Sequence, residues 1–167
     1  TLQPGAQDVK ACLARLYLDT SRAPKAEVLY RELLLEHEEP SLYANVGLAC
    51  YKQGKFQEAC DAYALALRLE PRDPRRLSNL GRSLMAIRHY EEAAHFLGQA
   101  LERLPMDIEL MHLLAQCFLQ VQELERAEEI YRRINRLEPG NAEVKEKIAA
   151  LAGGTPLVSL PRTHSSS

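Results

Sequence analysis

Apolar and polar residues alternate in residues 41–71 with the period of an α-helix, in two blocks separated by a short polar break. In the first block, apolar or small residues recur at i, i+3, i+4 and i+7, as Tyr43, Val46, Gly47 and Cys50. The second block keeps a helical spacing with Phe56, Ala59, Tyr63, Ala66 and Leu67. Gly54 between the blocks and Pro71 after them are typical of helix ends. The pattern predicts two amphipathic helices joined by a tight turn.

The same unit recurs with a period of 34 residues. Three sets of residues keep this spacing: Pro71, Pro105 and Pro139; Ala59, Ala93 and Ala127; Gly47, Gly81 and Ala115. A period of this length is typical of solenoids, in which each repeat packs only on its neighbours. The spacing therefore predicts one elongated domain with a stripe-like core.

The repeat resembles the tetratricopeptide repeat, whose signature is W-x2-L-G-x2-Y…A-x3-F…P. Three copies carry it: Tyr43, Val46, Gly47, Cys50, Ala59, Tyr63 and Pro71; Leu77, Leu80, Gly81, Leu84, Ala93, Leu97 and Pro105; Met111, Leu114, Ala115, Phe118, Ala127, Tyr131 and Pro139. A divergent copy precedes them, with Leu13, Ala14, Tyr17, Ala26 and Tyr30. The resemblance covers roughly residues 7–141 and implies an all-α fold, a right-handed superhelical solenoid of antiparallel helix pairs.

Breaks in the pattern divide the chain into seven segments. We expect a lead-in, four repeats, a capping helix and an extended tail, at residues 1–6, 7–39, 40–73, 74–107, 108–141, 142–152 and 153–167. The first helix, from about residue 7, is predicted to bury Val9, Leu13, Leu16 and Tyr17, and the second to run from about Pro24 to His37. The apolar tail is expected either to be disordered or to lie in a solenoid groove, its own or a neighbour's.

Small residues within the helices predict close packing. Gly47 and Gly81 lie inside predicted helices, where glycine costs about 1 kcal/mol relative to alanine. We expect these glycines, with Ala59 and Ala93, to let paired helices approach, so that a larger side chain costs roughly 1–3 kcal/mol. The turn glycine is not kept in every repeat, because Arg88 replaces it in the third.

Composition narrows the function classes. Hydrophobic residues make up 46% and charged residues 26% of the 167 residues, and the net charge of −2 does not favour nucleic acid or an anionic membrane surface. No apolar run approaches the ~18 residues of a membrane span, so we expect no direct membrane insertion. The four cysteines form no C-x-x-C pair. We interpret them as free thiols, which favours a reducing compartment such as the cytoplasm.

Residues that carry catalysis are not grouped in a known motif. No two of the five histidines have the i, i+4 spacing of a helical metal pair with a nearby carboxylate. The sequence holds no phosphate loop, nucleotide fingerprint or nucleophile elbow. We therefore expect no enzymatic activity, no cofactor and no metal.

The expected binding surface is the face of each first helix next to its buried stripe. In tetratricopeptide repeats such faces line a concave groove, and the resemblance implies the same here. The predicted groove residues are Arg15, Asn45, Leu48, Tyr51, Lys52, Arg75, Asn79, Arg82, His112 and Gln116. Asn45 and Asn79 are one repeat apart, and an amide can bind a peptide backbone through both a donor and an acceptor. Arg75, Asn79 and Arg82 share one helical face and suit a carboxylate.

These residues predict an extended peptide or partner protein as ligand, with an acidic side chain or a terminal carboxylate near the second and third repeats. The set is similar to the carboxylate clamp of chaperone-binding family members, but it is incomplete. Ala11 and Arg15 stand where the clamp has Lys and Asn, and Asn79 stands where it has Arg, so we do not expect a chaperone tail. The paired asparagines also look like the asparagine ladder of the O-linked N-acetylglucosamine transferase, although two asparagines are too few to establish homology.

The leading hypothesis is a non-catalytic protein–protein interaction scaffold or adaptor. One alternative is self-assembly into a homo-oligomer through exposed end helices, as in family members that build organelle coats, pili or secretion machinery. Another is a regulatory or targeting domain of a larger enzyme or secretion protein.

Overall fold

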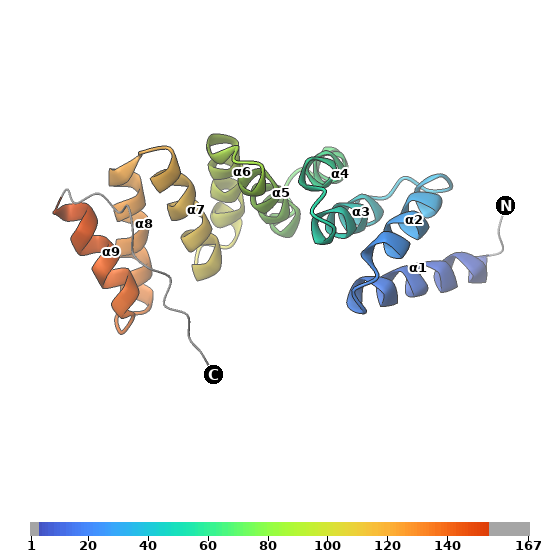
Figure 1. Ribbon diagram of the computed structural model, residues 1–167, viewed down its shortest axis with the longest axis horizontal. Coiled ribbons are helices and arrows are strands. Elements are labelled where there is room, and N and C mark those ends of the chain that lie inside the picture. Colours follow the sequence, from blue (N-terminus) through green and yellow to red (C-terminus); the bar gives the residue numbers. More distant parts are fainter. Residues whose placement is uncertain (1–3, 154–167) are drawn as a thin grey trace.

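A computed structural model describes residues 4–153, which fold into a solenoid of α-helices. The helices are α1 (Pro4–Asp19), α2 (Ala23–Leu34), α3 (Pro40–Lys52), α4 (Phe56–Leu69), α5 (Pro74–Ala86), α6 (Tyr90–Arg103), α7 (Ile108–Gln120), α8 (Leu124–Leu137) and α9 (Ala142–Ala152). Each packs mainly on the helix before it and the helix after it, so they follow one another along an arc with α1 and α9 at its ends (Figure 1). The predicted all-α fold class is confirmed.

Local sequence explains where several helices begin. Pro40 and Pro74 occupy the first turns of α3 and α5, where the missing N–H of proline costs no hydrogen bond. Asp73, Asp107 and Asn141 cap α5, α7 and α9, since each side chain accepts a hydrogen bond from a backbone N–H three residues later. None of the helices in the described range is long and apolar enough to cross a membrane.

The turn inside each repeat uses a left-handed backbone at one equivalent position. The φ angle is +75° at Gly54, and it is +58°, +65° and +61° at Ser21, Arg88 and Gln122. Only glycine adopts this conformation without steric cost, so the three other turns each carry strain of about 1 kcal/mol. The sequence signalled the left-handed residue at Gly54 alone.

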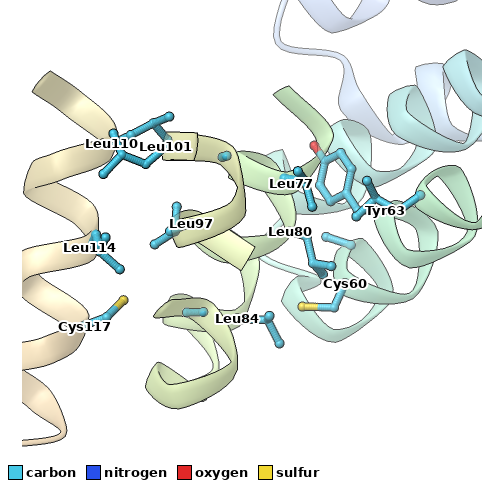
Figure 2. Close-up of a cluster of buried hydrophobic side chains, with 14 of the residues drawn as sticks. Cys60, Tyr63, Leu77, Leu80, Leu84, Leu97, Leu101, Leu110, Leu114 and Cys117 are labelled. Carbon is cyan, nitrogen blue, oxygen red and sulfur yellow. The ribbon is translucent and has the colours of Figure 1, made fainter. Parts of the chain in front are cut away.

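A continuous apolar stripe runs through all four repeats. Figure 2 shows side chains from α4, α5, α6 and α7 meeting in this stripe. Two close approaches support it: a Cβ atom on Gly47 would lie 3.0 Å from the Tyr63 ring, and one on Gly81 would lie 2.6 Å from Leu97 Cγ. The small residues therefore make room for the large side chain of the paired helix.

The first helix differs from its prediction in extent and in orientation. It begins at Pro4, so the second half of the expected lead-in is helical. Val9, Leu13 and Leu16 were predicted to be buried, but they are 67%, 38% and 55% exposed, and Ala14 is buried instead. The prediction failed because α1 has two apolar faces, and the face that carries Ala14 and Leu18 is the one that packs against the rest of the solenoid.

Two other expectations need correction or remain outside the structure. Helix α2 ends at Leu34, before the predicted end at His37. Residues 154–167 of the predicted tail lie outside the described residues, so its placement in a groove stays a prediction.

Candidate functional site

Seven of the ten predicted groove residues lie in two hollows on the first-helix side of the solenoid. The first hollow has a volume of about 400 Å³ and is lined by Arg15, Leu18, Asp19, Tyr30, Asn45, Leu48 and Lys52. The second has a volume of about 230 Å³ and is lined by Pro74, Arg75, Ser78, Asn79, Arg82, Leu104, Asp107, Glu109 and Leu110. The structure thus divides the predicted site: Asn45 belongs to the first hollow and Asn79 to the second.

The first hollow combines cations, an amide and an apolar wall. Lys52 Nζ donates a hydrogen bond of 3.2 Å to the backbone oxygen of Leu18, near the C-terminal end of α1, where helix carbonyls lack helical partners. Tyr30 also lines this hollow and is only 2% exposed. Burial raises the pKa of its phenol, so it stays neutral at physiological pH. With Arg15 exposed and Leu48 half-buried, the hollow can hold a carboxylate next to an apolar group.

The second hollow is partly neutralised by its own acids. Arg82 Nη2 donates a hydrogen bond of 2.7 Å to Glu109 Oε1, so a ligand carboxylate must compete with Glu109 for this guanidinium. Asp107 is used as the cap of α7. Arg75 is exposed and Asn79 is half-buried, and these two side chains can contact a ligand without breaking that ion pair.

Three predicted groove residues lie outside both hollows. Tyr51 is half-buried and packs edge-on against Phe56, with ring centroids 5.2 Å apart. His112 lies 6.2 Å from the ring of Tyr131, and burial lowers its pKa, so it is neutral at physiological pH. Gln116 is exposed on α7.

A polar network that the sequence analysis missed joins the first repeat to the second. Glu27 is 8% exposed and accepts hydrogen bonds from Arg31 Nε at 2.8 Å, Gln53 Nε2 at 2.8 Å and Lys55 Nζ at 3.0 Å. Burial alone would raise the pKa of Glu27, but the hydrogen bonds outweigh it and lower the pKa to about 2. The sequence contained one indication of this network. Glu27 directly follows the pattern alanine of the first repeat, and the equivalent position in the second repeat is occupied by the small residue Cys60.

The same network contains a group of metal-ligating atoms. Ligand atoms of Glu27, Cys50 and Glu58 lie within 4.8 Å of one another. Arg31 donates to both carboxylates, and burial raises the pKa of the Cys50 thiol to about 11. Because a metal ligand must be the thiolate, we interpret this group as an ion-pair network that holds two repeats together.

Comparisons with known proteins agree with this architecture. Two family models described as tetratricopeptide repeat match residues 40–73 and 88–151, which together make up more than half of the chain. No curated protein matches the sequence.

Several solved structures have a similar fold. MamA from Desulfovibrio magneticus RS-1 is 19% identical, with a TM-score of 0.78 over 88% of this chain and 89% of that chain. YrrB, described as a TPR protein with an unusual peptide-binding site, is 20% identical, with a TM-score of 0.78 over 87% and 75%. PilF from Pseudomonas aeruginosa is 24% identical, with a TM-score of 0.71 over 90% and 69%. At these identities the likeness concerns the fold alone.

Proposed function

The chain belongs to the tetratricopeptide repeat family, and we propose that it is a non-catalytic scaffold that binds an extended segment of a partner protein. The proposed binding face is formed by α1, α3, α5 and α7. The observation that carries the proposal is the pair of hollows on this face, each lined by at least one amide and by arginine or lysine.

Each hollow suits a different part of a peptide. In the first hollow, Arg15 and Lys52 would bind a carboxylate, and Asn45 would hydrogen-bond the adjacent backbone. In the second, Asn79 would repeat the backbone contact with Arg75 beside it. Asp19, Asp107 and Glu109 lie among these cations. A ligand with one carboxylate next to an apolar residue therefore fits better than a run of acidic residues. YrrB, a neighbour in fold, is described as having a peptide-binding site, so a peptide is a reasonable class of ligand to test for this chain.

A peptide selection tests the proposal. Short peptides with free C-termini would be displayed and selected on the wild-type chain, and the best binder would be synthesised with a free and with an amidated C-terminus. Affinities would be measured for a first-hollow variant (Arg15→Ala, Asn45→Ala, Lys52→Ala), a second-hollow variant (Arg75→Ala, Asn79→Ala) and a control (Arg103→Ala, Arg136→Ala). The control changes two exposed residues on second helices.

We expect at least one hollow variant to bind roughly tenfold more weakly, which corresponds to the loss of about 1.4 kcal/mol, while the control binds like the wild type. Circular dichroism would verify that all variants are folded. Equal affinity of both hollow variants and the wild type would contradict the proposal.

One structural observation favours self-assembly as a second function: α1 exposes an apolar face at one end of the described solenoid. The hypothesis of a regulatory or targeting domain is tested by the full-length reading frame, which would have to encode an enzyme or a secretion domain beside these repeats.

A further inference from the structure

Helix α1 exposes a strip of three large apolar side chains. Val9, Leu13 and Leu16 stand at i, i+4 and i+7, so they lie on one face of the helix, and each is more than one third exposed. Cys12, which is also exposed, lies at the edge of this face. We name Val9, Leu13 and Leu16 the α1 strip.

The repeat pattern shows what covers this face elsewhere in the molecule. In the repeat pattern, Ala14 is equivalent to Gly47, Gly81 and Ala115. In the same register, Leu13 is equivalent to Val46, Leu80 and Leu114. Leu16 is equivalent to Ala49, Ser83 and Cys117. All six of the corresponding residues are buried. They belong to α3, α5 and α7, which pack on the preceding helices α2, α4 and α6, and Figure 2 shows Leu80, Leu114 and Cys117 in that packed stripe. The α1 strip is therefore a helix-stacking surface.

The opposite end of the solenoid does not complement this surface. The exposed residues of α9 include Glu143, Lys145 and Glu146, so head-to-tail stacking would place charged groups on apolar side chains and desolvate them without compensation. The faces of α2, α4 and α6 that cover such positions are already occupied by α3, α5 and α7. Of the first and the last helix of the described residues, α1 and α9, α1 is the one whose exposed face matches the α1 strip.

We propose that two copies of this chain associate through the α1 strip across a two-fold axis, with the two α1 helices antiparallel. In this arrangement Val9 of one copy lies against Leu16 of the other, and the two Leu13 side chains meet near the axis. A two-fold contact pairs a patch with itself, so apolar atoms cover apolar atoms along the whole strip. Seven residues of helix span about 10 Å. This is shorter than a standard interface, so we expect a weak, reversible dimer.

Sedimentation equilibrium tests the dimer directly. The full chain would be measured from about 1 to about 300 µM, a range in which a weak, reversible dimer changes from mostly monomeric to mostly dimeric. The test variant is Val9→Glu with Leu16→Glu, because these are the two most exposed members of the strip and their replacement leaves the core intact. The matched control is Met106→Glu, which also removes an exposed apolar side chain but lies between α6 and α7.

We expect the wild type and Met106→Glu to shift from monomer to dimer mass, and the strip variant to remain monomeric while its circular dichroism spectrum is unchanged. A wild type that stays monomeric over the whole range overturns the proposal. So does a strip variant that dimerises like the wild type.

Oxidation of Cys12 provides a second test of how the two α1 helices are arranged in the dimer. Treated with diamide, two Cys12 thiols would lose two protons and two electrons to the reagent and form one disulfide, while diamide is reduced to the hydrazine. We expect a covalent dimer in the wild type, none in Cys12→Ser, and at least tenfold slower formation in the strip variant. Crosslinking at equal rates in the wild type and the strip variant contradicts the two-fold contact.

Discussion

The first and third repeats share one helix–turn–helix plan but are held by different interactions. In the third repeat, Leu80, Leu84 and Leu97 are buried, and Gly81 allows α5 to approach α6 closely. In the first repeat, the buried Glu27 collects three hydrogen bonds and ties α2 to the following helix pair. One repeat pattern thus accommodates a contact that depends on charge and a contact that depends on volume. The two kinds of contact respond to different changes.

The largest expected effect is on the charged contact. Replacing Glu27 by Gln should lower the free energy of unfolding at pH 7 by up to about 3 kcal/mol, because the pKa of Glu27 falls from its ordinary value of 4.5 to about 2 on folding. Because the pKa of Glu27 is lower in the folded state, its ionised form contributes its full stabilisation above the unfolded-state pKa. This stabilisation is lost as the pH falls from about 4.5 to about 2. Urea denaturation of both proteins should therefore show a gap at pH 7 that closes near pH 2. A gap of constant size would argue that Glu27 acts by packing instead.

The volume-dependent contact should respond to one methyl group. Gly81→Ala should destabilise the protein by about 2 kcal/mol, although alanine is the better helix former, because the new Cβ would lie 2.6 Å from Leu97 Cγ. Gly98→Ala in α6 is the matched control, since a Cβ there meets nothing within 4 Å, and it should stabilise by up to about 1 kcal/mol. Thermal melts of the two variants should move in opposite directions. Similar shifts for both would contradict the assigned role of Gly81.

The smallest effects concern the turns, where the two repeats are alike. Ser21 and Arg88 both have positive φ angles, so replacing either by glycine should relieve strain of about 1 kcal/mol and, after the entropic cost of glycine in the unfolded chain, raise stability by up to about 0.5 kcal/mol. Gly54→Ala should have the opposite sign, because Gly54 has a φ of +75°. Chemical denaturation would measure all three. Destabilisation by both new glycines would show that the side chains of Ser21 and Arg88 contribute more than their backbone strain costs.

The sequence predicted the fold because the contacts of a solenoid are local. The spacing of Pro71, Pro105 and Pro139 and of the small residues was enough to identify helix pairs stacked in order. It could not orient α1, because two apolar faces compete there and periodicity does not show which one a neighbour covers. It also missed the Glu27 network, since Gln53 and Lys55 are 26 and 28 residues away and their proximity arises only on packing.

The sequence proposed candidate site residues but could not give the shape of the surface that they line. Helical spacing grouped Arg75, Asn79 and Arg82, and the structure lines one hollow with all three. Spacing could not show that Asn45 lies in a different hollow, because this depends on how successive repeats are rotated. The pairing of Arg82 with Glu109 was hidden for the same reason.

We propose that the face of α1, α3, α5 and α7 binds peptide, and NMR titration of the isotopically labelled chain with the selected peptide would locate the binding face. We expect the side-chain amide signals of Asn45 or Asn79 to shift, together with backbone signals of the helices that line the same hollow. Shifts confined to α2, α4, α6 and α8 would contradict it and would place the binding site on the second helices.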